Sequence, residues 1–457
     1  MELDTNTWAA QQWASVDLGD QRLNRRALRV GTKMAAQPGE SLPGQMGSLA
    51  ELKATYRFMS NPRVEWTSVV QPHCSQTLRE ARQTPVVLMI QDGSHLDYTA
   101  HAATTGLGPI GDHRGRGLIL HSTLAVTPDE RRVLGLANLQ IFVRPSSAPA
   151  HVKGQRRQSP EGQAWEHAAQ QIGAPPAGVM WVHVSDRESD VYDYLAECVQ
   201  QSNQFLVRAY KNRRLGVAEP AATPEQATFH LLDHIRACAA VSEQGYTLAL
   251  PAHDGQPARQ ARLALVWETL RLRPPVYATE RGELVVSIVR AWEPDPPAGV
   301  DAVEWLLLSS LPVHTIADAL RLVHWYECRW LIEDFHMCLK TGCGIERSQL
   351  DQAADLQRLI AFAAPIAVRL LQLRQDVRHM PAALASTQIE PLMLTVLARK
   401  QNLDSASLSL AEFWRRVARL GGHLGRKSDG PPGWRTLWKG WRLLSTLTEG
   451  ARLALSP

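Results

Sequence analysis

Two short apolar runs, each followed by an aspartate, constrain the fold of this chain more than any other feature. Residues 86–90 are entirely apolar and precede Asp92, and the mostly apolar residues 179–184 precede Asp186. Apolar runs of this length are typical of strands buried on both faces, as in the central sheet of an α/β protein. We therefore expect a core sheet that carries a carboxylate at the ends of two of its strands.

The stretches around these runs fit the same α/β core. Residues 118–126 and 134–143 are strand-like, and the turn-rich residues 127–130 lie between them, which predicts a β-hairpin. After the second apolar run we expect a helix at 191–200 and a strand at 204–209. Residues 211–303 are rich in proline and contain alternating stretches, which predict a β-rich insertion that interrupts the core.

Both ends of the chain have helical patterns. The first 70 residues contain a break at Pro38-Gly39 and a predicted helix at 48–59 that ends before Asn61-Pro62. The residues beyond about 350 are also helical in pattern. We therefore predict three domains: a helical domain at 1–70, a catalytic core at 71–350 and a helical domain at 351–457.

The positions of the charged residues say more about a binding partner than the net charge does. The net charge of +4 is too small to indicate a partner. Arginines 22, 25, 26 and 29 are spaced to lie on one helix face. A second basic group lies near the C-terminus and comprises Arg415, Arg416, Arg419, Arg426, Lys427, Arg435, Lys439 and Arg442. Solvated charge explains either group alone as well as phosphate binding does, but the two together favour a polyanionic partner.

Composition and termini indicate a globular protein of the cytoplasm. Hydrophobic residues make up 44% of the chain and charged residues 21%, as in globular domains. The purely apolar runs are too short to span a membrane, and the N-terminus is acidic where a secretory signal is basic. The six cysteines are scattered, so we expect reduced thiols. A zinc site near Cys338 and Cys343 is the weaker alternative, because no paired knuckles are present.

Carboxylates at the ends of neighbouring strands converge in the crevice where open α/β sheets place their chemistry. They are hard oxygen ligands that suit Mg²⁺ or Mn²⁺. Asp186 could instead cap the helix that follows it, and Asp97, Glu188 and Asp190 are competing acids. Asp190 is the better candidate for the N-cap of the helix beginning at residue 191.

Residues 316–340 predict one long helix with a polar stripe. Tyr326, Arg329, Glu333 and Lys340 fall within an arc of about 60° at 100° per residue. The rest of the helix carries large apolar side chains, among them Trp325 and Trp330, which predict that it is buried. A polar stripe on a buried helix faces something polar, and a metal site with a bound phosphodiester would satisfy all four groups.

These residues resemble the DDE transposases of bacterial insertion sequences, in the insertion sequence four family and in particular its transposon-five type. The family pattern Y-x2-R-x3-E-x6-K is matched at Tyr326, Arg329, Glu333 and Lys340. The segment D-R-E-A-D is matched from Asp186 onward, with serine in place of alanine. A third segment is similar at Ile90-Gln91-Asp92. The likeness extends to both ends of the chain.

The resemblance implies a ribonuclease-H-like core with a β insertion, flanked by an N-terminal domain that binds transposon ends and a C-terminal domain that dimerises in a synaptic complex. By the family pattern, Asp92, Asp186 and Glu333 would hold two Mg²⁺ ions, for which Mn²⁺ can substitute. The implied contacts with double-stranded DNA, at the ends and at the target, are made by Tyr326, Arg329, Lys340, Trp305, Arg208, Arg22 and Arg26. Trp305 would stack on a flipped base during a hairpin-forming cut.

The sequence also differs from the family pattern at two places. Leu118 and Ile119 stand where the transposon-five type has two tryptophans, and a basic segment ahead of the C-terminal domain has no counterpart. The predicted function is a cut-and-paste transposase that cleaves its ends and joins them to target DNA. Two alternatives remain open: a catalytically silent DNA-binding relative or inhibitor, and a ribonuclease-H-like nuclease without transposition.

Overall fold

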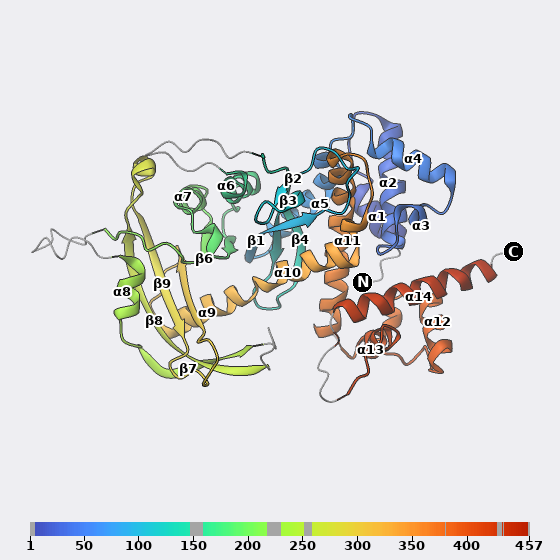
Figure 1. Cartoon of the computed structure of the whole chain (residues 1–457). Helices are drawn as coiled ribbons and strands as arrows, with labels where there is room; N and C mark the ends of the chain where they lie inside the picture. The colour runs from blue at the N-terminus through green and yellow to red at the C-terminus, as the bar shows by residue number, and fades with distance from the viewer. Residues whose placement is uncertain are drawn as a thin grey trace, which may run out of the picture.

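A computed structural model of the chain describes residues 5–146, 159–216, 230–250, 258–379, 381–426, 432 and 434–455. A broad mixed sheet extends from the left end to the middle of the molecule, with the N-terminal helices at the upper right and the C-terminal helices at the lower right (Figure 1). Lys427 of the basic C-terminal group and parts of the predicted insertion (217–229 and 251–257) lie outside the described residues.

The N-terminal region is helical, as predicted. Its helices are α1 (Thr5–Trp13), α2 (Gln21–Ala36), α3 (Leu42–Met46), α4 (Leu49–Met59) and α5 (Trp66–Ala81). Side-chain caps begin two of them: Asp20 accepts from the Arg22 amide, and Ser48 from the Glu51 amide. Gly31 of α2 faces the Trp13 ring so closely that a Cβ there would lie 2.3 Å from a ring carbon. That glycine sets the spacing between α1 and α2.

The central sheet has ten strands in the order β2-β3-β1-β5-β6-β10-β9-β8-β7, with β4 beside β3. Its first six strands along the chain are β1 (Val86–Asp97), β2 (Gly108–Ile110), β3 (Gly115–Val126), β4 (Val133–Phe142), β5 (Met180–Ser185) and β6 (Gln204–Arg208). β4, β3 and β1 pair antiparallel, and β1, β5 and β6 pair parallel. This is a ribonuclease-H-like core, so the predicted hairpin and fold class are confirmed.

Helices cover both faces of the core sheet. α6 (Pro160–Ile172) and α7 (Tyr192–Gln200) lie on one face, and the later helices α9 to α11 lie on the other (Figure 1). In β1, Val87 and Met89 face the side of α6, whereas Leu88 and Ile90 join the cluster that includes α10 and α11. Period-two alternation therefore sends the two sets of β1 side chains into two different apolar layers.

The insertion is β-rich, as predicted, and it extends the core sheet. It contains α8 (Leu231–Ala237), β7 (Ser242–Leu250), β8 (Arg259–Leu272), the 3-10 segment η3 (Val276–Arg281) and β9 (Leu284–Trp292). β9 pairs with β10 (Glu304–Ser309), and β10 pairs with β6. The insertion therefore interrupts the core in sequence but continues its hydrogen-bonded ladder in space.

The predicted single helix at 316–340 is wrong in detail. The segment divides into α9 (Ile316–Glu327), α10 (Trp330–Met337) and a π-helical turn, η4 (Cys338–Gly342), followed by η5 (Ile345–Arg347). Trp330 is 53% exposed, contrary to the prediction of an apolar buried surface around the whole helix. π-Helical turns occur mostly where side chains are redirected within a helix, and here the turn redirects the chain that follows Glu333.

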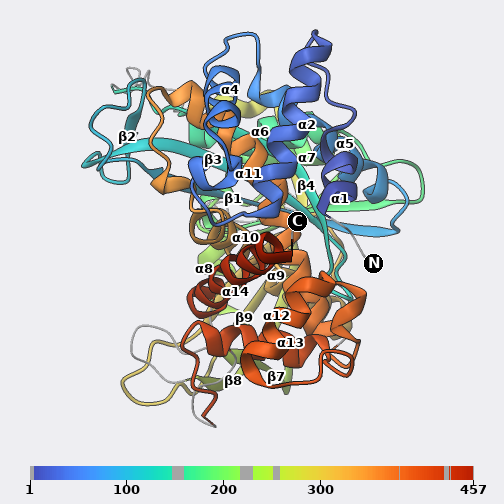
Figure 2. The ribbon, with the colours of Figure 1, turned by 90° about the vertical axis from the view of Figure 1, so that its right-hand side faces the viewer.

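The C-terminal region is helical, as predicted, and comprises α11 (Ala353–His379), η6 (Ala385–Thr387), α12 (Pro391–Gln401), α13 (Leu410–Leu420) and α14 (Trp434–Leu455). α11 packs against α5, β4 and α2, so it ties the core to the N-terminal helices. Figure 2 shows α14 crossing above α12 and α13. Among the described helices, residues 353–375 alone are long and apolar enough to cross a membrane, and 78% of that window is buried inside the protein.

Asp190 does not cap the helix that follows it, contrary to prediction. The N-cap of α7 is Val191, which has no side-chain cap. The Asp190 carboxylate is fully buried, accepts from the amides of Tyr210 and Lys211, and pairs with Arg213 at 2.5 Å. It thereby fastens the segment after β6 to the start of α7.

We predict that Asp190→Asn lowers the free energy of unfolding by about 3–5 kcal/mol, because it leaves the buried Arg213 guanidinium without a counter-charge. Urea denaturation of the purified chain measures this. The matched control is Asp112→Asn, whose partner Arg114 is 89% exposed, and we expect it to cost less than about 1 kcal/mol. Equal losses in the two variants would contradict the role assigned to Asp190.

Candidate active site

The register of two parallel strands brings Asp92 and Asp186 together. The ladder between β1 and β5 has Ile90 opposite Val184 as its last pair. Each aspartate is two residues further on, so both lie on the same face of the sheet. Asp92 was predicted to follow its strand. It lies instead inside β1, opposite Ser122 of β3. Asp186 does follow β5 directly.

The Asp92 carboxyl lies in a crowded, negatively charged environment. The pKa of Asp92 is raised to about 7, mainly by burial, next by the nearby Asp186 carboxylate, and to a smaller extent by Glu333. The Arg329 guanidinium and a hydrogen bond from the Gly93 amide oppose these effects. The structure therefore places Asp92 within electrostatic reach of both other predicted acids.

Asp186 also has the local role that the sequence left open. Its side chain accepts a hydrogen bond of 2.8 Å from the Glu188 amide and caps the 3-10 turn η1 (Arg187–Ser189). Glu188 lies beside it, and burial together with the Asp186 charge raises the Glu188 pKa. Capping uses one carboxylate oxygen of Asp186 and leaves the other available to a ligand.

Arg329 links two of the three acids. Its guanidinium lies 2.9 Å from Glu333 and 3.6 Å from Asp92. It also stacks at 4.9 Å over Trp330, the exposed ring beside it. The Arg329 Nε is buried and has no hydrogen-bond partner within the described part of the chain. A buried guanidinium nitrogen without an acceptor is costly, and an anionic oxygen would satisfy it.

Tyr326, Trp305 and Arg208 form the adjoining surface on the same face of the sheet. The Tyr326 and Trp305 rings meet edge to face at 5.4 Å, and both are nearly buried. Burial raises the Tyr326 pKa, while the charges of Arg329 and Arg208 lower it. Arg208 donates to the Glu304 carbonyl at 3.0 Å, which holds it beside the strand that carries Trp305.

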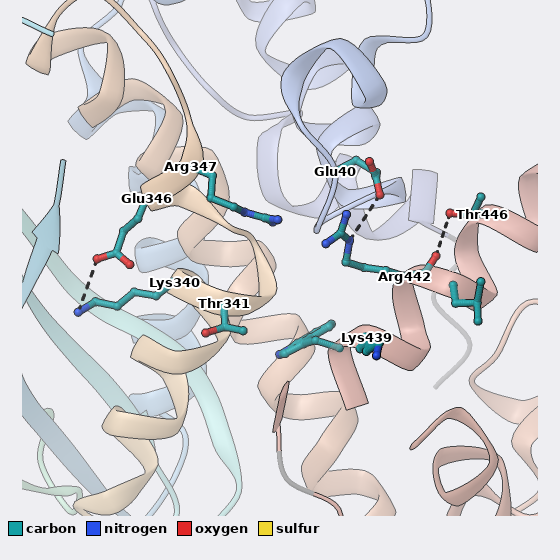
Figure 3. A pocket seen from close by; sticks show the side chains of 10 residues that line it. Glu40, Lys340, Thr341, Glu346, Arg347, Lys439, Arg442 and Thr446 are labelled. Carbon is teal, nitrogen blue, oxygen red and sulfur yellow. Dashed lines mark hydrogen bonds and ion pairs between the residues drawn. The ribbon is translucent and has the colours of Figure 1, made fainter. Parts of the chain in front are cut away.

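Lys340 does not share a single helical face with the other three residues, contrary to prediction. The π turn places it further along β1, near His95 and Asp97, and 4.0 Å from Glu346. It lines a cavity of about 570 Å³ together with residues of η5 and α14 (Figure 3). The charged residues of its wall are Lys340, Glu346, Arg347, Lys439, Arg442 and Glu40.

This cavity, which we call the basic cleft, joins the three regions of the chain. Arg442 of α14 lies 3.6 Å from Glu40, and Arg347 donates to the Gly39 carbonyl. Four of its charged residues are cationic and two are anionic, so its electrostatic character suits an anionic ligand. Sequence reasoning singled out Lys439 and Arg442 as members of a basic group but missed Arg347, because no periodicity connects it with them.

The predicted arginine stripe on α2 is partly neutralised. Arg26 and Arg29 each lie 2.8 Å from Glu51 of α4. Arg22 is exposed near the N-terminus of α2. The two residues predicted to contact DNA here therefore differ: Arg26 has a carboxylate partner within the fold, whereas Arg22 extends from the surface.

A buried polar network lies behind the acids on the opposite face of β1. The Gln91 amide is hydrogen-bonded to His183 at 2.7 Å, to His121 at 3.1 Å and to the Tyr194 hydroxyl at 3.2 Å. These contacts join β1, β3, β5 and α7 directly beneath Asp92. Sequence reasoning missed this network, because isolated polar residues inside apolar runs carry no periodic signal.

The three acids fit a hard divalent cation by chemistry and charge. Their oxygen donors suit Mg²⁺. Burial, and next the repulsion from Asp186, raise the Asp92 pKa, and a bound cation would relieve that repulsion. Glu333 is turned toward Arg329. Among the described residues, one set of three possible ligands has all its atoms within 4.8 Å of one another, and it is a different set: His234, Cys238 and Glu268.

A mixed core sheet with acids on neighbouring strands, flanked by helices that carry exposed arginines, suits a protein that binds DNA. Residues 5–64 match the family model for transposase DNA-binding, and residues 362–457 match that for the Tn5 transposase dimerisation domain. Both matches support a Tn5-like transposase of the insertion sequence four family. It is a DNA-binding protein with a homodimerisation domain at its C-terminal end.

Buried neutral histidines make the fold sensitive to acid. Burial lowers the pKa of His73 to about 4 and those of His121, His183 and His336 to about 3. Unfolded histidine titrates near 6.5, so below that pH the unfolded chain binds more protons than the folded one. Their contribution to stability is therefore complete above about pH 6.5 and is lost as the pH falls toward the folded pKa values.

We predict that His73→Gln reduces the acid sensitivity of folding. At pH 5.5 a histidine with a folded pKa of about 4 destabilises the fold by about 1.4 kcal/mol relative to neutral pH. Unfolding free energies of the parent and the variant at pH 7.5 and 5.5 measure this difference. Carboxyls with raised pKa values act in the opposite direction in both proteins and cancel in the comparison. An unchanged pH dependence in the variant would show that His73 is protonated in the folded chain.

Proposed function

We propose that the protein is a cut-and-paste DNA transposase that binds transposon ends, cleaves them by metal-dependent phosphoryl transfer and joins their 3′ ends to target DNA. The observation that carries this proposal is that Asp92 lies within electrostatic reach of Asp186 and Glu333, and that Arg329 contacts both Asp92 and Glu333. The matches to DNA-binding and dimerisation domains at the two ends support it. Its place of action is the bacterial cytoplasm, where the DNA is accessible.

Asp92, Asp186 and Glu333 would hold two Mg²⁺ ions, with Mn²⁺ as a substitute. When bound, the ions would activate a water or a 3′-hydroxyl and stabilise the leaving oxygen. The protein supplies the carboxylates and positions them through the strand register. Glu333 would exchange its contact with Arg329 for the metal site, since its side chain is 45% exposed.

Arg329 would bind the phosphodiester next to the acids. Its Nε lacks an acceptor within the described residues, and its guanidinium would be released toward the DNA when Glu333 turns to the metal. A guanidinium fits two phosphate oxygens at once, which fixes the orientation of the scissile group. Tyr326, whose pKa is raised by burial, stays protonated at neutral pH and can donate to a phosphate oxygen.

Trp305 and Arg208 would serve the displaced strand. The Trp305 ring lies beside Tyr326, at the edge of the face that carries the acids. Stacking of a flipped base there would accompany cleavage through a hairpin. Lys340 and the basic clefts of two protomers would hold the DNA further from the cut, since each cleft joins the core to the C-terminal dimerisation region.

We predict that Asp92→Asn abolishes Mg²⁺-dependent cleavage of a duplex that carries a transposon end, while DNA binding persists. The change removes one negative charge and one metal ligand with almost no change in volume. Gel electrophoresis of labelled duplex measures cleavage, and a mobility shift measures binding. Asp97→Asn is the matched control. Asp97 lies on the same strand, but its carboxylate accepts a hydrogen bond from the Thr99 hydroxyl, so this variant should cut normally. Normal cutting by Asp92→Asn would refute the assignment of this acid.

We predict that Arg22→Ala weakens binding to end DNA. The slope of the logarithm of the binding constant against the logarithm of salt concentration should fall by about one, as expected for the loss of one phosphate contact. Fluorescence anisotropy at several salt concentrations measures both quantities. Arg271→Ala, an exposed arginine of β8 in the insertion, removes the same charge outside the N-terminal region. If the two variants lose affinity equally, the effect is one of net charge and not of a contact at Arg22.

A further inference from the structure

A cluster of three different ligand types lies in the insertion, away from the proposed active site. His234 and Cys238 are four residues apart at the C-terminal end of α8, and Glu268 lies on β8. Their nitrogen, sulfur and oxygen ligand atoms all lie within 4.8 Å of one another. All three side chains are partly buried, so the cluster is accessible from solvent but sheltered.

We propose that His234, Cys238 and Glu268 form a binding site for a zinc-class divalent cation that clips α8 to the insertion sheet. His234 lies in the last turn of α8, and Cys238 is the residue that directly follows the helix, so the imidazole and the thiol both lie at its C-terminal end. A mixed nitrogen, sulfur and oxygen set suits Zn²⁺ and related transition ions rather than Mg²⁺. With three protein ligands, a water would complete four-coordination.

The charges around the cluster favour a cation over an internal ion pair. Arg290 and Arg236, the neighbouring cations, both pair with Glu304, at 2.9 and 2.7 Å. Arg290 is further occupied by stacking over Trp292 and by donating to the Arg236 carbonyl. Within the part of the chain that the structure describes, the Glu268 carboxylate has no ion pair of its own. The two arginines therefore do not neutralise it.

Cys238 is a protonated thiol that a metal would deprotonate. Burial raises its pKa, the Glu268 charge raises it further, and Arg290 acts in the opposite direction. Its Sγ donates a weak hydrogen bond of 3.4 Å to the His234 carbonyl. On metal binding the S–H bond breaks, a sulfur–metal bond forms and one proton is released to solvent. No oxidant or reductant is needed.

The clip would act on the proposed active site at a distance. Arg236 of α8 holds the carboxylate of Glu304, and the Glu304 carbonyl accepts from Arg208. Trp305 is the next residue along β10. Fixing α8 against β8 would therefore hold the strand end that carries Trp305 and Arg208. The ion is structural in this role, because none of its ligands lies among the three acids.

The test is a Co²⁺ titration of the full-length protein in excess Mg²⁺, which keeps hard carboxylate sites occupied. Cobalt bound to a cysteine thiolate gives a near-ultraviolet charge-transfer band, which oxygen ligands do not give. We expect one equivalent of this band, displaced by Zn²⁺, and a higher melting temperature with Zn²⁺. Cys238→Ser should abolish the band, and Cys343→Ser, a partly buried cysteine elsewhere, should retain it.

Glu268→Gln supplies a second variant on the partly buried face of a strand, where misfolding is not expected. It should keep the band and bind Co²⁺ at least about 10-fold more weakly. The proposal is overturned if the parent protein shows no thiolate band, if Cys238→Ser keeps it, or if Glu268→Gln binds with unchanged affinity. All of these readouts are independent of DNA cleavage, so they do not depend on the proposed catalytic function.

Discussion

The Asp92 and Asp186 carboxylates are held close together because β1 and β5 are parallel neighbours. Each aspartate lies two residues beyond the last pair of their ladder, Ile90 and Val184. Burial and the repulsion from Asp186 raise the pKa of Asp92. The Arg329 guanidinium and the Gly93 amide act in the opposite direction and stabilise the negative charge. Arg329 lies between Asp92 and Glu333 and offsets part of it. On the opposite face of β1, the hydrogen bonds of Gln91 to His183 and His121 join β1 to β5 and β3, which helps to hold the strand register that brings the carboxylates together.

The break after α9 determines how this site connects with the rest of the molecule. α9 and α10 keep Tyr326, Arg329 and Glu333 over the sheet, whereas the π turn directs Lys340 away along β1. Lys340 thereby reaches the basic cleft, whose other wall is α14. Because α14 belongs to the dimerisation region, the cleft couples the core to the part of the chain that meets a second copy.

Sequence patterns correctly predicted the helices and strands in which buried side chains recur at a regular spacing. The hairpin of β3 and β4, the β-rich insertion and the helical ends were all predicted correctly, because burial on one or both faces leaves a period in the sequence. The same reasoning failed for Asp190, which was assigned to a cap but pairs with Arg213 from a segment 23 residues away. A buried ion pair between distant segments leaves no local period.

The sequence by itself determined the identity of the groups at the site: two aspartates after apolar runs, and a helix with tyrosine, arginine and glutamate at spacings that keep them on one side. It could do so because strand and helix periods are local consequences of backbone geometry. Only the tertiary structure decided how those groups meet. The β1–β5 register, the break at Arg329, the redirection of Lys340 and the cluster of His234, Cys238 and Glu268 all arise from packing between segments far apart in the chain. Their contact energies depend on distances that no single segment encodes.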